Sequence, residues 1–127
     1  MTPRDPQLVL VVDDDVDIRD ALKDLLSDEG YRIAEAADGG AALDYLAANP
    51  LPSLILLDWN MAPVNGAQFM DEFIKRPIAA RVPVVLVTAD ARVQHDPSDR
   101  RFAAQLRKPV PLDKLFAVIH DLSRCVS

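Results

Sequence analysis

The chain alternates between short runs of consecutive apolar residues and segments in which apolar residues recur every three or four positions. Consecutive aliphatic and β-branched residues are typical of strands buried on both faces of a sheet, and the wider spacing is typical of amphipathic helices. We expect five strands, at residues 8–12, 32–36, 54–57, 84–87 and 103–107. We expect helices at residues 18–26, 38–47, 67–75 and 112–122.

This alternation predicts an α/β fold with a doubly wound, five-stranded parallel sheet and helices on both of its faces. Right-handed crossover connections favour the flavodoxin-like strand order 2-1-3-4-5. Residues 90–102 fit the pattern poorly, because Asp96 and Pro97 interrupt them and few apolar side chains are available for burial. We therefore expect a short or irregular fourth helix there. A length of 127 residues suits one domain, 1–127, and leaves no room for a second fold.

The composition, 50% hydrophobic and 27% charged, suits a globular domain. The formal net charge of −6 gives no general electrostatic reason to bind nucleic acid or an anionic membrane. The apolar runs are too short to span a bilayer, and residues 1–6 do not resemble a signal peptide, so we expect a cytoplasmic protein. The single cysteine, Cys125, excludes an internal disulfide and is expected to be inert.

Polar residues follow four of the five expected strands. Ligands of open parallel sheets bind beyond the carboxyl ends of the strands, so these residues are candidates for a site. They are Asp13, Asp14, Asp58, Thr88 and Lys108. The three carboxylates would repel one another at close range unless a cation holds them ionised together. Lys108 is one candidate, and Mg²⁺, which prefers oxygen ligands, is the other.

This combination predicts phosphoryl transfer to a carboxylate. Asp58 would be the nucleophile, because aspartates form acyl phosphates and an ionised carboxylate needs no general base. A metal held by Asp14 and Asp58 would neutralise one oxygen of the transferred group. The Lys108 ammonium would pair with a second oxygen, and the Thr88 hydroxyl would bind a third.

Each of these residues, taken singly, has a structural explanation. Asp14 could cap the first helix, and Asp58 could be a turn residue after its strand. The Thr88 hydroxyl could bond to nearby backbone, and Lys108 could be a solvated surface lysine. Their joint occurrence at successive strand ends favours the functional interpretation.

Four sequence blocks resemble the receiver domain, the phosphoacceptor module of response regulators in bacterial two-component signalling. They are residues 11–15 (VVDDD), 57–61 (LDWNM), 87–89 (VTA) and 108–109 (KP). As an ordered set with these gaps they are highly specific, and the resemblance covers residues 8 to about 124. Residues 58–61 (DWNM) of the second block are especially similar to the corresponding residues of stand-alone chemotaxis-type regulators.

The resemblance implies roles for the acidic residues and their neighbours. Asp58 matches the phosphorylated aspartate. Asp13 and Asp14 match the acidic pair that places a divalent metal, which implies Mg²⁺ as the cofactor. Asn60 matches a residue whose backbone carbonyl binds that metal.

The resemblance also implies how the phosphoryl group is held. Thr88 matches the hydroxyl that moves towards it, and Ala89 matches a small residue whose N–H contacts it. Lys108 matches the phosphate-pairing lysine, and its bond to Pro109 is expected to be cis. Gly66 matches the glycine that opens the third helix.

Three departures from the family pattern stand out. Ala62 stands where the family usually has proline, which comes one place later as Pro63. Gln105 stands where the family usually has an aromatic switch residue. The gap between Thr88 and Lys108 is about two residues shorter than in chemotaxis-type regulators. The usual output face is therefore in doubt, and we expect signalling through a rearranged loop or another face.

The sequence is thus interpreted as a response regulator that is not an enzyme but assists its own phosphorylation and dephosphorylation. The resemblance implies that a sensor histidine kinase or a histidine phosphotransfer protein donates to Asp58, and that the acyl phosphate switches affinity for a downstream protein target. The alternative is a receiver-fold binding module whose output does not depend on phosphorylation. The sequence leaves open the cognate kinase, the target, the oligomeric state and whether the chain is a fragment.

Two other readings fit less well. Asp13 and Asp15 partly resemble the opening motif of haloacid dehalogenase-type hydrolases, but Asp17 stands where that motif has threonine or valine. A calcium loop starting at Asp13 would need glycine at its sixth position, which is Ile18. A nucleotide-binding reading lacks a glycine-rich loop.

Overall fold

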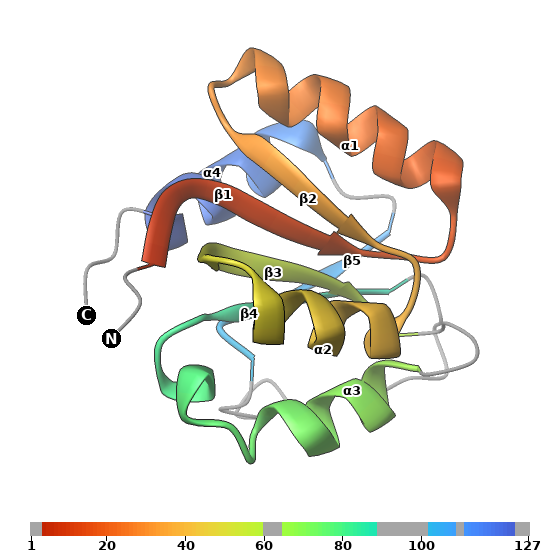
Figure 1. The fold of residues 1–127 in the computed structure, drawn as a ribbon. Coiled ribbons are helices and arrows are strands. Elements are labelled where there is room, and N and C mark those ends of the chain that lie inside the picture. The colour runs from red at the N-terminus through yellow and green to blue at the C-terminus, as the bar shows by residue number, and fades with distance from the viewer. Residues whose placement is uncertain (1–3, 60–64, 89–101, 109–110, 124–127) are drawn as a thin grey trace.

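The computed structural model describes residues 4–59, 65–88, 102–108 and 111–123 (Figure 1). Within these ranges the chain forms five strands, four α-helices and one short 3-10 helix. In chain order they are β1 (Arg4–Val12), α1 (Val16–Asp28), β2 (Arg32–Ala36), α2 (Gly39–Ala48), β3 (Leu51–Asp58), α3 (Gly66–Phe73), η1 (Pro77–Ala80), β4 (Val84–Thr88), β5 (Ala104–Arg107) and α4 (Leu112–Ser123).

The five strands form one parallel sheet in the order β2-β1-β3-β4-β5, which confirms the predicted α/β fold and its strand order. Helices α1 and α4 cover one face of the sheet, and α2 and α3 cover the other (Figure 1). The predicted fourth helix at residues 90–102 lies, apart from Phe102, outside the described residues. Helix α4 is therefore the predicted last helix, at residues 112–122.

Alternate side chains of the strands supply two separate cores. Leu10, Ile55 and Leu57 are buried against α2 and α3, together with the stacked rings of Phe69 and Phe73. On the opposite face the buried strand side chains meet Leu26 of α1 and Leu115 and Ile119 of α4; they are Val9, Val11, Leu54, Leu56, Val85 and Leu106. Burial on both faces explains why the strands are continuous apolar runs in the sequence.

Short polar side chains set where the helices begin. The Asp15 carboxylate accepts hydrogen bonds from the backbone N–H groups of Asp17 and Ile18 at the start of α1. Asp38 caps α2 in the same way, as predicted. Asn65 and Gln68 form a reciprocal capping box at the start of α3. Asp15 rather than Asp14 therefore caps α1, which leaves the Asp14 carboxylate available for another role.

Two strands begin earlier than the sequence pattern predicts. Strand β1 begins at Arg4 instead of residue 8, and its register with β3 shifts between Asp5 and Val9. Strand β3 begins at Leu51 instead of residue 54, although its second residue is Pro52. Prolines cannot donate to a sheet ladder, so their presence at these ends hides the extra strand residues from a pattern analysis. None of the helices in the described ranges combines the length and apolar character needed to cross a bilayer.

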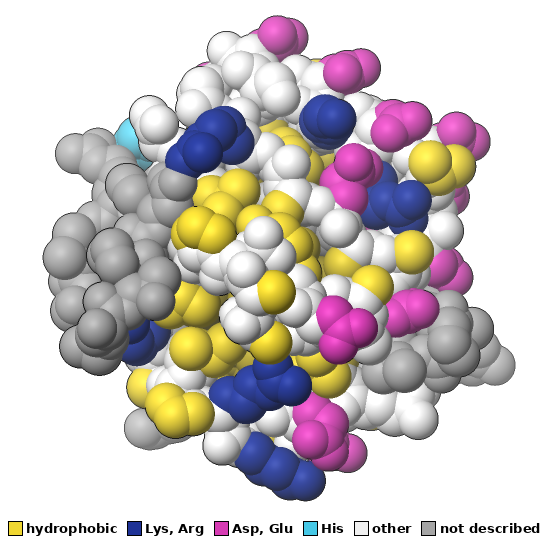
Figure 2. Space-filling model, viewed as in Figure 1, with side chains coloured by type: hydrophobic (Ala, Val, Ile, Leu, Met, Phe, Trp, Pro, Cys, Tyr) yellow, Lys and Arg dark blue, Asp and Glu magenta, His cyan; other side chains and the backbone are white. Residues whose placement is uncertain are grey.

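Acidic side chains gather along α1 on the face of the molecule that Figure 2 shows. The helix contributes four exposed aspartates, Asp17, Asp20, Asp24 and Asp28. These charges lie on the solvated side of α1, whereas Leu26 faces the sheet. Helix α1 accordingly contributes four of the 20 acidic residues of the chain.

Candidate functional site

The parallel register brings the predicted site residues to one edge of the sheet. Val12 of β1 pairs with Leu57 of β3, so Asp13, which follows β1, and Asp58, the last residue of β3, are neighbours. On the other side, the carbonyl of Thr88 at the end of β4 accepts a 2.9 Å hydrogen bond from the Lys108 N–H. The site is therefore a direct consequence of the strand order.

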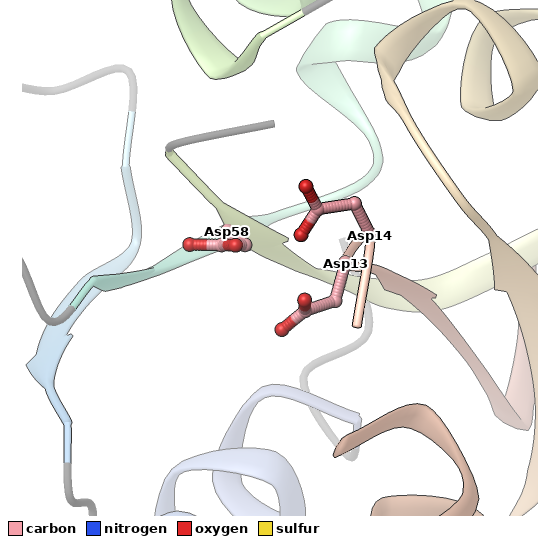
Figure 3. Close-up of side chains that lie close together, drawn as sticks. All are labelled: Asp13, Asp14 and Asp58. Carbon is pink, nitrogen blue, oxygen red and sulfur yellow. The ribbon is translucent and has the colours of Figure 1, made fainter. Parts of the chain in front are cut away.

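The carboxylates of Asp13, Asp14 and Asp58 converge, as Figure 3 shows. Each offers an oxygen that lies within 4.8 Å of an oxygen from each of the other two. Asp13 is buried, Asp58 is half-buried, and Asp14 is exposed. Three carboxylate oxygens, one of them from an exposed side chain, suit a small divalent cation that keeps part of its hydration shell.

The Lys108 ammonium lies among these carboxylates. Its Nζ donates a 3.1 Å hydrogen bond to Asp13 Oδ2 and lies 3.9 Å from Asp58 Oδ1. The side chain of Lys108 is 23% exposed, against 6% for Asp13 and 12% for Asp58. One cation therefore offsets part of the charge of three carboxylates, and the remaining negative charge attracts a second cation.

Thr88 is 6% exposed at the last position of β4. In the register of the sheet its neighbour on β5 is Arg107, the residue before Lys108. The structure thus brings Asp13, Asp14, Asp58, Thr88 and Lys108 to the same edge. Asn60, Ala89 and the bond to Pro109 lie outside the described residues, as do Ala62 and Pro63.

A cavity of about 430 Å³ opens beside the acidic cluster. Helices α1 and α4 line it with aliphatic side chains, including those of Ile18, Leu22 and Leu115. Asp13, Asp58 and Lys108 form its polar end. The charged groups accordingly stand next to an apolar wall, where electrostatic interactions are stronger than in open water.

Trp59, the residue after Asp58, packs on the face of the sheet that α2 and α3 cover. Its carbonyl accepts a 2.9 Å hydrogen bond from the Gly66 N–H at the start of α3. Its ring meets Phe102 edge-on, with centroids 6.0 Å apart and an interplanar angle of 74°. Gln105, the position of the expected aromatic residue, is half-buried on β5 beside Leu86 of β4.

Sequence reasoning missed Arg19 of α1. A guanidinium N–H of Arg19 donates to the backbone carbonyl of Asp13, and its Nε lies 3.6 Å from Glu35 Oε1. A signal was present, because Arg19 lies three and seven residues before Leu22 and Leu26. It therefore belongs to the apolar stripe of α1, where a charged residue needs a buried partner.

Comparisons with known proteins agree with this geometry. The family model of the response regulator receiver domain matches residues 9–120. The response regulator MprA of Mycobacterium sp. (strain KMS) is 34% identical over 124 residues, which are 96% of this chain and 53% of MprA. The phosphate regulon transcriptional regulatory protein PhoB of Escherichia coli (strain K12) is 36% identical over 81 residues, 64% of this chain and 35% of PhoB. The chain thus spans about a third to a half of these relatives.

A solved structure gives the same result. The response regulator TrrA from Thermotoga maritima, crystallised in complex with Mg²⁺–BeF, has a TM-score of 0.79 and 29% identity. The match covers 91% of this chain and 98% of TrrA. Fold, edge-of-sheet site and family model all agree. The chain belongs to the response regulator receiver domain family, whose members are the phosphoacceptors of two-component systems.

Proposed function

We propose that Asp58 accepts a phosphoryl group from a phosphohistidine of a sensor histidine kinase or of a histidine phosphotransfer protein, with Mg²⁺ bound. The observation that carries the proposal is the convergence of three carboxylates and the Lys108 ammonium at the carboxyl edge of the sheet. Formation of the acyl phosphate then changes the affinity for a downstream protein target.

The transfer needs a nucleophile and a means of offsetting charge. A carboxylate oxygen of Asp58 attacks phosphorus, the new O–P bond forms, and the N–P bond to the donor imidazole breaks. The bonding electron pair stays on the imidazole nitrogen. Asp58 is half-buried, and its Oδ1 lies 3.9 Å from the Lys108 ammonium, so its carboxylate is partly accessible and has a positive charge beside it.

The donor set fits Mg²⁺. Asp13, Asp14 and Asp58 each supply an oxygen within 4.8 Å of the others, and Mg²⁺ prefers such hard oxygen ligands together with water. The resemblance adds the backbone carbonyl of Asn60. When bound, the ion would offset negative charge on the transferred phosphoryl group. The Mg²⁺–BeF complex of TrrA supports the choice of metal.

The remaining groups hold the phosphoryl oxygens. Lys108 Nζ is within reach of Asp58 and can pair with an oxygen of a group bound there. The buried Thr88 hydroxyl is proposed to bind another oxygen, with the N–H of Ala89. These residues act on the group bound to their own chain, so we propose a regulatory phosphoacceptor that assists its own phosphorylation and dephosphorylation.

We propose that the output uses a face other than the usual one. Gln105 replaces the expected aromatic residue, and it is only half-buried on β5. A cytoplasmic location and a protein partner, rather than nucleic acid, fit the family and the acidic surface of α1.

The test is incubation with MgCl₂ and acetyl phosphate, followed by measurement of the intact mass. We expect the mass of the chain to rise by one phosphoryl group, and we expect no gain in Asp58→Asn. No gain in the parent chain would favour the alternative, a receiver-fold binding module that works without phosphorylation.

A further inference from the structure

We propose that Arg19, paired with Glu35, is a positioning residue that holds the Asp13 carboxylate in the orientation needed to bind Mg²⁺. This inference rests on the proposed function of the acidic cluster. Arg19 itself contacts neither the cluster's carboxylate oxygens nor, in the proposal, the metal. It acts through the backbone of Asp13.

The first observation is the place of the guanidinium. The Arg19 side chain is 15% exposed, although it belongs to a helix whose other charged side chains face water. An N–H of its Nη1 donates to the carbonyl of Asp13. Its Nε is buried and has no hydrogen-bond partner within the described ranges, but lies 3.6 Å from Glu35 Oε1. A buried cation is kept only where its charge is paired.

The second observation is that the Asp13 peptide is held on both sides. Its N–H donates a 3.1 Å hydrogen bond to the carbonyl of Ala36 in β2, and its carbonyl accepts from Arg19. Glu35, the partner of Arg19, precedes Ala36 in the same strand. Groups of helix α1 and of strand β2 therefore both form hydrogen bonds with the Asp13 backbone.

The third observation is that both oxygens of the Asp13 carboxylate are engaged. Oδ1 accepts a 2.9 Å hydrogen bond from the Asp15 N–H, and Oδ2 accepts from Lys108. A rotation of the Asp13 backbone would break these contacts and turn the carboxylate away from Asp14 and Asp58. Groups that orient metal ligands typically change metal affinity about 10–100-fold when they are removed.

The contacts at position 19 suit arginine better than lysine. A guanidinium presents several N–H donors in one plane and can bond a carbonyl and approach a carboxylate at once. A lysine ammonium at the end of a flexible chain keeps the charge but lacks this planar geometry. Arg19→Lys therefore separates the positioning role from the charge.

The sign of the effect separates positioning from simple electrostatics. A nearby positive charge repels Mg²⁺, so Arg19→Met would tighten metal binding if charge alone mattered. If Arg19 positions Asp13, the same substitution weakens binding. A purely structural role would lower the free energy of unfolding and leave the affinity of the folded protein for Mg²⁺ unchanged.

The experiment is a titration of the full chain and of each variant with MgCl₂, in which amide chemical shifts in NMR spectra report binding of the ion. Urea unfolding of each variant measures its stability separately. We expect Arg19→Met to weaken Mg²⁺ binding about tenfold or more, Arg19→Lys to weaken it about three- to tenfold, and Glu35→Gln to weaken it by less. Lys75→Met is the matched control, because it removes the same charge from an exposed pair with Glu72. We expect it to change the affinity less than twofold.

Unchanged or tighter Mg²⁺ binding in Arg19→Met would overturn the inference. If that variant does not fold, Arg19→Lys decides, and an affinity equal to that of the parent chain would overturn the inference equally. Failure of the parent chain itself to bind Mg²⁺ or to accept a phosphoryl group would instead reject the proposed function, and the inference with it.

Discussion

The Lys108 ammonium donates a 3.1 Å hydrogen bond to the Asp13 carboxylate, although 95 positions separate the two residues in the chain. The contact joins the end of β5 to the end of β1 across the carboxyl edge of the sheet. It brings a positive charge to the most buried member of the acidic cluster. The same ammonium lies within 3.9 Å of Asp58, so it can act on both residues.

We predict that Lys108→Ala still binds Mg²⁺ but is phosphorylated more slowly. The three carboxylates remain, and the loss of a competing cation favours the metal. The transferred group loses an electrostatic partner, which typically slows such reactions on the order of 10²-fold. The measurement is the initial rate of mass gain with acetyl phosphate. Lys75→Ala, at an exposed lysine, serves as the control, and a parental rate in Lys108→Ala would show that Lys108 is not the phosphate partner.

We predict that Asp14→Asn raises the stability of the metal-free protein and lowers its affinity for Mg²⁺. The exposed Asp14 carboxylate adds repulsion to Asp13 and Asp58, so its neutralisation should raise slightly the urea concentration at the unfolding midpoint without metal. It should also weaken Mg²⁺ binding, because a charged ligand is lost. Urea unfolding with and without MgCl₂ measures both. Weaker stability without metal would argue against mutual repulsion in the cluster.

Mg²⁺ is predicted to stabilise the folded chain. An ion that binds only the native state at ten times its dissociation constant adds about 1.4 kcal/mol to the free energy of unfolding. The gain should disappear when EDTA is added and in Asp58→Asn. Thermal unfolding monitored by circular dichroism, compared in MgCl₂ and in an equal ionic strength of NaCl, measures it. An identical gain in NaCl would mean that no specific site is filled.

Gly66→Ala is predicted to destabilise the fold, although alanine favours helices over glycine. A Cβ at this position would lie 2.6 Å from Trp59 Cε3 and 3.0 Å from Trp59 Cα. Such overpacking typically costs about 1–3 kcal/mol, more than the ~1 kcal/mol of helix propensity gained. Urea unfolding measures the loss, and a second substitution, Trp59→Leu, should recover part of it. A gain in stability for Gly66→Ala alone would contradict the contact.

Much of the fold can be predicted from the sequence because strands buried on both faces are continuous runs of apolar residues. The apolar runs around Val11, Leu56 and Val85 are typical of central strands, and the parallel order then brings Asp13, Asp58 and Lys108 to one edge. These were predictions from pattern alone, and the structure confirms the fold and the convergence.

Contacts between distant residues could not be predicted in the same way. The edge-on packing of Trp59 and Phe102 depends on side-chain directions that no periodicity records. The role of Arg19 was missed because a charged helix residue is usually solvated, and its pairing with Glu35 requires knowledge of how α1 lies on β2. The residue roles assigned by resemblance, including those of Asn60 and Ala89, remain predictions.

Chemical trapping of the phosphorylated residue tests the central claim most directly. The chain is phosphorylated with acetyl phosphate and MgCl₂, reduced with borohydride, digested and sequenced by tandem mass spectrometry. Borohydride converts an aspartyl phosphate to homoserine, which marks the acceptor. The account predicts homoserine at position 58, only when Mg²⁺ is present. Homoserine at position 13 or 14 instead, or at no aspartate, would contradict it.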